Sequence, residues 1–331
     1  MSFNTYLQSQ ARLNTYAEAK ALKRAMPFEC LSMFGSARML PSNSTDNITF
    51  RRVNPFPVAT TLTEGLVPSS RTLTKTNVAA TVSEYGDLVR FTNRDFDLSP
   101  EETVKEASEA CGDQIVETRE NVLWNVLRAG TAVGYSNGSA RNTTNTTITV
   151  NAMDAAVRVL ESNRAKKISK KVATDDSFNT VNVRPSYIAF CHTDMKRDIQ
   201  ALAGFLDAKD YSDLVHPEEF GARGHVRFVT CPHFEAFYAA GSGTINGMKQ
   251  TGANTDVYPI VIVGEEAYGH VTVRGKDGML SGAALKVLLP NKLDSGNPLG
   301  QFGSVGWKGW FTALRLNEAW IYRIETCATA L

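Results

Sequence analysis

The sequence lacks the features that mark several large classes of protein. Its 35 lysines and arginines are balanced by 34 acidic residues, so the net charge of +1 lacks the basic excess typical of nucleic-acid-binding proteins. The longest aliphatic run, residues 260–263, is far too short to cross a bilayer, and the first 20 residues contain no apolar core of a secretory signal. With 24 glycines and 12 prolines in 331 residues, collagen-like and low-complexity chains are excluded.

Cysteine is sparse as well, without a CxxC pair or the spacing of a zinc ribbon. The five residues are Cys30, Cys111, Cys191, Cys231 and Cys327. We expect them to be reduced and mostly buried, as in a reducing cytoplasm. Cys191–His192 and Cys231–Pro–His233 would meet as metal ligands only if two strands were neighbours, and each lies where a core strand meets a turn. We therefore predict no metal site and no cofactor.

No catalytic motif is complete in this chain. Residues 269–276 exceed a P-loop by one residue and lack its Ser or Thr, and residues 241–246 fail the dinucleotide-binding fingerprint at the last glycine. The paired carboxylates are adjacent in sequence, so the two members of a pair do not face one site, and the five histidines are scattered singly. We predict that the protein is not an enzyme and has no catalytic residues.

The first third of the chain has little apolar surface of its own. Residues 3–25 have helical spacing, residues 28–47 are expected to be irregular, and residues 48–60 are extended, with Pro55 and Pro57 excluding a central strand. Strand character resumes at residues 78–92, with a bulge or turn expected at Gly86–Asp87. An isolated hairpin is marginal in water, so this excursion is either mobile or covered by another chain.

The clearest pattern in the sequence is a helix at residues 99–130. Ser99, Pro100 and two glutamates form a typical helix start, and apolar residues follow at steps of three and four. We expect this helix to be the strut around which the rest is arranged. After this helix we expect a strand at 147–150 and a second helix at 151–164. The basic run at 164–171 is either a solvated loop or a phosphate-facing patch. The remaining expected elements are strands at 187–191, 227–230, 258–263 and 285–289 and a final Trp-rich segment at 305–327. The predicted fold class is α+β.

Several motifs, in this order and spacing, resemble one family. They are RRVNPFPVATTLTEGL at 51–66, VSEYGD at 82–87, ET at 117–118, AGT at 129–131, GEEAYG at 264–269, NPLGQ at 297–301, VGWK at 305–308, LNE at 316–318 and RIE at 323–325. The chain resembles the major capsid proteins of N-four-like podoviruses and related tailed phages. Together the motifs cover most of the chain from residue 48 onward, and residues 134–255 match least well.

The resemblance implies the tailed-phage and herpesvirus-floor capsid fold, also called the Hong Kong phage fold. Its parts would be an N-terminal arm at 1–47, an extended loop at 48–93, a peripheral domain with the spine helix at 94–133, a mainly axial domain at 134–285 and a return to the peripheral domain at 286–331. The implied function is a structural one. Hexamers and pentamers would assemble into an icosahedral head around double-stranded DNA, and an encapsulin-like cellular compartment of the same fold is the alternative.

The resemblance also implies partners and a location. Only about 47 residues precede the extended loop, so a separate scaffolding protein is implied. Further implied partners are a portal, a decoration protein as a candidate, and packaged DNA, which would be contacted without sequence specificity. The resemblance implies no contact with a membrane, and we assign no crosslinks. The protein would reside in the virion after assembly in the host cytoplasm. The predicted inter-subunit contacts, whose alternative is simple solvation of a hairpin, are Tyr6, Leu13, Arg51, Arg52, Pro55, Pro57, Glu64, Arg71, Lys75, Tyr85 and Asp87.

Overall fold

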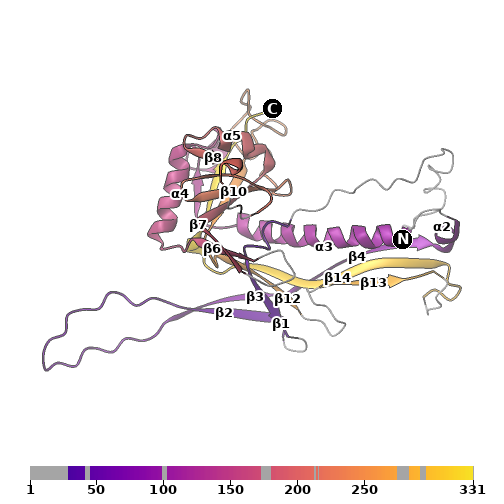
Figure 1. The fold of residues 1–331 in the computed structure, drawn as a ribbon, viewed down its shortest axis with the longest axis horizontal. Helices are drawn as coiled ribbons and strands as arrows, with labels where there is room; N and C mark the ends of the chain where they lie inside the picture. Colours follow the sequence, from indigo (N-terminus) through magenta and orange to yellow (C-terminus); the bar gives the residue numbers. More distant parts are fainter. Residues whose placement is uncertain are drawn as a thin grey trace.

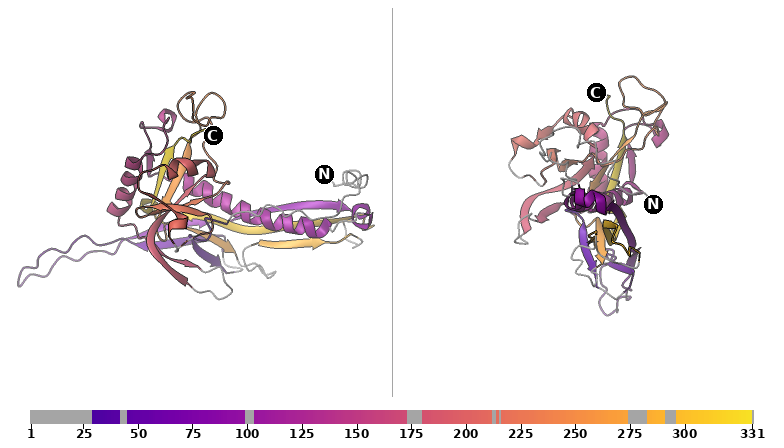
Figure 2. Two further views of the ribbon diagram at one scale, coloured as in Figure 1. Left: turned by 45° about the horizontal axis from the view of Figure 1, so that its top comes forward. Right: turned by 90° about the vertical axis from the view of Figure 1, so that its right-hand side faces the viewer.

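The chain folds into a globular part from which two long limbs extend. The structure, a computed structural model, describes residues 29–41, 45–98, 103–172, 180–211, 214, 216–273, 283–290 and 296–330. One limb is elongated and consists of helix α3 (Thr103–Arg128) lying along a sheet, and the other is a two-stranded hairpin (Figure 1). Two views agree that the limbs leave the globular part in opposite directions (Figures 1 and 2). The predicted α+β class is confirmed.

The globular part is built on a mixed eight-stranded sheet. The order is β5-β15-β11-β7-β10-β9-β8, with β6 paired to β7. The strands are β5 (Val133–Tyr135), β6 (Ile168–Val172), β7 (Thr180–Cys191), β8 (Phe205–Asp207), β9 (Glu219–Arg223), β10 (Val226–Thr230), β11 (Tyr258–Val263) and β15 (Ile321–Thr326). In β11, Ile260 and Ile262 face one core while Val261 and Val263 face another. Burial on both faces explains why this strand is a continuous apolar run.

Helices cover the two faces of this sheet. Helix α4 (Val150–Ser162) begins where the Thr149 side chain accepts a hydrogen bond from the Ala152 N–H at 3.3 Å, and its buried residues include Met153 and Leu160. The predicted strand at 147–150 is wrong, because this segment is the entry to α4. The remaining short helices of the globular part are η2 (Arg141–Thr143), η3 (Thr193–Met195), α5 (Lys196–Gln200), η4 (Ala208–Asp210) and η5 (Glu318–Trp320).

The elongated limb is centred on the long strand β14 (Phe302–Arg315). Strand β4 (Ser83–Thr92) pairs with one edge of β14, and β13 (Ala283–Leu288) and β12 (Tyr268–Val273) pair with the other. Strand β1 (Ser36–Leu40) extends the sheet by pairing parallel to β12. A short helix, α2 (Asn93–Leu98), follows β4.

Helix α3 joins the elongated limb to the globular part. Its 26 residues span about 39 Å at 1.5 Å per residue. In the first half of α3, Gln114 accepts a hydrogen bond from the Trp307 indole of β14 at 2.8 Å. Its last turns enter the globular core, where Trp124 stacks on Phe234 with ring centroids 4.5 Å apart. The predicted strut helix is therefore confirmed over Thr103–Arg128, and residues 99–102 lie outside the described residues.

Three local expectations are wrong. Gly86 and Asp87 form neither a bulge nor a turn, because β4 pairs with β14 from Ser83 to Thr92 without a register shift. A Cβ at Gly86 would lie 2.6 Å from the Trp307 carbonyl oxygen, so glycine is required by close approach of two strands. Residues 28–47 are not irregular throughout, because they include β1, and the basic run at 164–171 is not only a loop, because β6 begins at Ile168.

The hairpin limb consists of β2 (Asn47–Val53) and β3 (Lys75–Thr81). The two strands pair in register from Asn47↔Thr81 to Val53↔Lys75. Their base packs on a small cluster that includes Leu40, Val82 and Val271. The hairpin residues packed on this cluster lie in β2 and β3, and none of the cluster residues lies in the outer part of the limb, residues 54–74.

The described residues contain no helix that is long and apolar enough to cross a membrane. All five cysteines are free and buried, as expected.

Candidate functional site

The outer part of the hairpin is a loop at residues 54–74. Its tip is a turn at Glu64 and Gly65, where the Leu66 N–H donates to the Thr63 carbonyl at 3.2 Å. Gly65 has φ +79°, a conformation that favours glycine. Farther back, the Arg71 guanidinium donates to the Pro57 carbonyl at 3.2 Å and so bridges the two sides of the loop. The loop thus has a defined turn although no helix or strand supports it.

Several large apolar side chains of this loop are exposed to solvent. The most exposed are Phe56 at 56%, Val58 at 89%, Leu62 at 74%, Leu66 at 70% and Val67 at 92%. Moving one such side chain from water into a packed surface is worth about 1.5–3 kcal/mol. A group of exposed large apolar side chains of this kind is typical of an interaction surface. The loop therefore favours docking against a surface outside its own subunit.

Seven of the predicted contact residues lie in the hairpin limb and are exposed. They are Arg51, Arg52, Pro55, Pro57, Glu64, Arg71 and Lys75. The two prolines lie beyond the end of β2, which agrees with their exclusion from a central strand. Arg51 also donates to Asn77 across the strand pair at 3.1 Å. The structure brings these residues to one limb, and their contact with a second subunit stays a prediction.

The other four predicted contact residues lie elsewhere. Tyr85 stacks on Phe311 with centroids 4.2 Å apart, in the sheet of the elongated limb. Asp87 accepts a hydrogen bond from Gln114 at 2.7 Å, and this bond lowers the pKa of the Asp87 carboxyl. Both side chains have partners within the chain, and nothing tests them as inter-subunit contacts. Tyr6 and Leu13, with the predicted helix at 3–25, lie outside the described residues.

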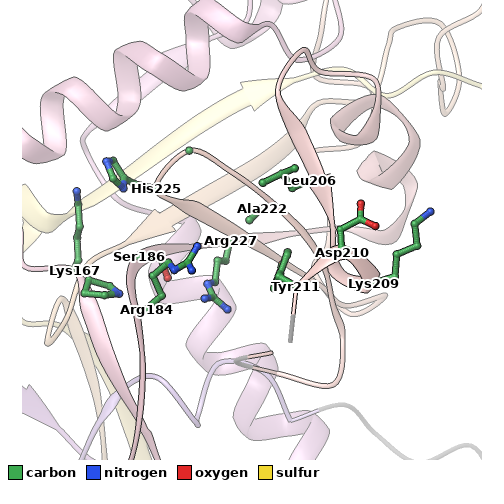
Figure 3. A pocket seen from close by; sticks show the side chains of 12 residues that line it. Lys167, Arg184, Ser186, Leu206, Lys209, Asp210, Tyr211, Ala222, His225 and Arg227 are labelled. Carbon is green, nitrogen blue, oxygen red and sulfur yellow. The ribbon is translucent and has the colours of Figure 1, made fainter. Parts of the chain in front are cut away.

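The globular part contains a pocket of about 940 Å³ beside strands β7 to β10 (Figure 3). Its cationic residues are Lys167, Arg184, Lys209 and Arg227. Three of these four have carboxylate partners: Lys167 with Glu161 at 3.1 Å, Lys209 with Asp207 at 3.3 Å and Arg227 with Glu219 at 3.4 Å. Most of the positive charge is thus neutralised by the protein itself, so the pocket does not form a strong site for an anion.

The two Cys–His segments do lie on neighbouring strands, but their side chains do not converge. The Cys231 N–H donates to the Cys191 carbonyl at 3.2 Å. His192 Nδ1, however, accepts from the Asp194 N–H at 3.1 Å, and His233 Nδ1 lies 3.3 Å from a Glu117 oxygen. Within the ranges that the structure describes, no three His, Cys, Asp or Glu residues form a group that could hold a metal ion.

Sequence reasoning missed the apolar residues of the loop as contact candidates. It selected the charged and proline residues there, whereas the large apolar side chains with the highest fractional exposure are Val58, Leu62 and Val67. The available signal was a set of isolated large aliphatic residues in a stretch otherwise rich in Thr, Ser, Gly and Pro.

Comparisons with known proteins agree with this architecture. The model of a family described as phage capsid protein matches residues 75–324. The capsid subunit of Ralstonia phage GP4 superposes with a TM-score of 0.67 at 11% identity, covering 100% of this chain and 99% of that one. A chain of the head structure of Helicobacter pylori bacteriophage KHP40 superposes with a TM-score of 0.64 at 11% identity, covering 100% of this chain and 98% of that one. A chain of the cyanophage Pam1 capsid asymmetric unit superposes with a TM-score of 0.62 at 13% identity, covering 97% of this chain and 98% of that one. A search of curated protein sequences finds no match.

Proposed function

The chain belongs to the phage capsid protein family, and from this premise we propose that the loop at 54–74 clamps each subunit onto a neighbour in the shell. The protein is a capsid shell protein of the virion, and no finding favours the encapsulin-like alternative. The resemblance to phage capsid proteins is confirmed at the level of the family, while the N-four-like podovirus type stays a prediction.

The observation that carries the clamp is the exposure of five large apolar side chains on one limb. Stable interfaces bury about 1,200–2,000 Å² in total, and a limb that reaches outside the subunit adds contact area without enlarging the core. Each subunit of a shell touches several neighbours, so contacts of modest strength add through geometry. The exposed Arg51, Arg52 and Lys75 would supply the polar rim around the apolar centre.

The finer features of assembly belong to the same proposal. Hexamers and pentamers form the shell in the host cytoplasm, with a separate scaffolding protein and a portal, and a decoration protein is a further candidate partner. Packaged DNA is contacted without sequence specificity, which agrees with a net charge of +1. The protein acts without catalysis. The five-part division of the chain at residues 47, 93, 133 and 285 is proposed with it.

The test is to replace residues 61–69 by a short Gly-Ser linker, which leaves β2 and β3 intact. The full-length protein and the shortened variant are expressed with and without the scaffolding protein and examined by negative-stain microscopy. We expect shells from the full-length protein and none from the shortened variant. Heads recovered from infected cells should contain DNA rather than cargo enzymes. Shells at normal yield from the variant would show that the loop is not the clamp.

A further inference from the structure

Residues 29–32 connect the segment 1–28 to the folded body and are held from several sides. The Glu120 carboxylate of α3 accepts hydrogen bonds from the backbone N–H groups of Cys30 at 3.2 Å, Leu31 at 2.7 Å and Ser32 at 3.0 Å. The Ser32 hydroxyl lies 2.8 Å from the same carboxylate and 2.7 Å from Glu29 Oε1, and its single proton serves one of these two acceptors. Both Glu120 oxygens therefore accept hydrogen bonds from backbone N–H groups.

Two further side chains hold the carbonyl groups of this segment. The Tyr268 hydroxyl of β12 donates to the Leu31 carbonyl at 2.6 Å. His216 Nε2 lies 3.0 Å from the Glu29 carbonyl, and His216 Nδ1 accepts from the Glu218 N–H at 3.0 Å, which places the ring proton on Nε2. The segment is thus bound by α3, by β12 and by the turn before β9. We call residues 29–32 the arm root.

Burial makes this arrangement specific for a carboxylate. Glu120 is 2% exposed, and Cys30 and Leu31 are fully buried. Among the described residues, the hydrogen-bond donors to Glu120 are neutral groups on the arm root. A buried carboxylate costs desolvation free energy, and helix packing at this position would be served better by an apolar residue. The charge is therefore explained by the three convergent N–H groups, which only a pair of acceptor oxygens satisfies.

We infer that Glu120 is a positioning residue for assembly, because it fixes residues 30–32, the point at which the chain N-terminal to residue 29 is attached to the subunit. This inference rests on the proposed function, since the position of that segment matters only if it meets another subunit. Glutamine at this position has the same shape but turns an NH₂ group toward backbone donors. Glu120→Gln thus removes part of the arm-root binding without emptying the core.

The experiment measures amide hydrogen exchange of the unassembled protein and then its shell yield. The matched control is Glu117→Gln, which makes the same change one turn earlier on α3, at a side chain that is 45% exposed. In Glu120→Gln we expect the amides of residues 30–32 to exchange at least about tenfold faster than in the parent protein. The amides of residues 123–127, on the same helix, should stay within about twofold, and the control should match the parent throughout.

A second variant keeps the test informative if Glu120→Gln fails to fold. Tyr268→Phe removes only the hydroxyl bound to Leu31, and it should raise exchange at the same amides by a smaller factor. Unchanged exchange at residues 30–32 in the folded variants would overturn the inference, as would equal acceleration along all of α3, which marks a merely structural role.

Shell yield separates this inference from the proposed function. We expect the parent and Glu117→Gln proteins to form shells in the presence of scaffolding protein and Glu120→Gln to form at least about tenfold fewer. Normal shells from Glu120→Gln, despite a loosened arm root, would overturn the inference alone. Failure of the parent protein to form shells would overturn the proposed function, while the exchange result would still report on the arm root.

Discussion

At the scale of single residues, Glu325 on β15 is a buried acid with two arginine neighbours. Its carboxylate is fully buried and accepts two hydrogen bonds from Arg141, at 2.8 and 2.7 Å. Arg323, only 6% exposed, lies 2.9 Å from the same carboxylate. Two guanidinium groups thus depend on one acid, and burial lowers the pKa of Arg323 while the Glu325 bond raises that of Arg141. This group joins β15 to the loop after β5 and stabilises the fold.

We predict that Glu325→Gln lowers the free energy of unfolding by about 3–5 kcal/mol, because it leaves a buried guanidinium without its counter-charge. The control, Glu161→Gln, breaks the ion pair between Glu161 and Lys167. The Glu161 side chain is 48% exposed, so this substitution should lower the free energy of unfolding by at most about 1 kcal/mol. Urea denaturation of the unassembled proteins, followed by circular dichroism, measures both. Equal effects from the two substitutions would contradict this account.

At the scale of secondary-structure elements, two glycines should respond in opposite ways to alanine. In β4, a Cβ at Gly86 would meet the Trp307 carbonyl oxygen at 2.6 Å, so Gly86→Ala forces the strands β4 and β14 apart. We expect a loss of about 1–3 kcal/mol in unfolding free energy. In α3, a Cβ at Gly112 would meet nothing within 4 Å, and alanine favours the helix, so Gly112→Ala should gain about 0.5–1 kcal/mol. Thermal denaturation decides the signs, and a stabilising Gly86→Ala would refute the close-approach argument.

Elements also show what the sequence allowed us to predict. Strand β11 was predicted at residues 258–263 and lies there, because burial on both faces imposes an apolar run that is visible locally. Helix α3 was predictable because its apolar positions recur at helical spacing. Strand β1 was missed because its parallel partner, β12, lies more than 200 residues away and its five residues are too few to establish an alternating pattern. Thr149 was assigned to a strand on residue type, although it caps a helix.

The candidate site was predictable as a limb but not in its detail. The prolines and polar residues of 48–77 indicated that this stretch has no core of its own. Whether Leu62 or Val67 is covered depends on tertiary packing, which residue type does not report. The arm root was not foreseen for the same reason. No local sequence pattern distinguishes Glu120 from the other acidic residues of α3. Its three backbone partners come from a segment about 90 residues earlier.

At the scale of the whole molecule, folding and assembly draw on separate surfaces. Helix α3 contributes to the cores of both the globular part and the elongated limb, so these two parts share packing. The loop at 54–74 contributes to neither, since the apolar hairpin residues in the nearest cluster lie in β2 and β3. Substitutions in the loop should therefore leave the stability of the subunit unchanged and act on shell formation alone.

We predict this separation for the variant Leu62→Ser, Leu66→Ser and Val67→Ser. The three side chains are 70–92% exposed, so their removal costs the subunit no packing, and its free energy of unfolding should change by less than about 0.5 kcal/mol. Shell yield should fall at least tenfold, since each lost aliphatic contact is worth about 1.5–3 kcal/mol in every interface it enters. Leu206→Ser, which alters a side chain 57% exposed on the globular part, is the control and should assemble normally. Sedimentation of the assembly reaction measures the yield. A triple variant that is destabilised as a monomer would mean that the loop folds onto its own subunit, and one that assembles normally would mean that the apolar side chains are not what the neighbour binds.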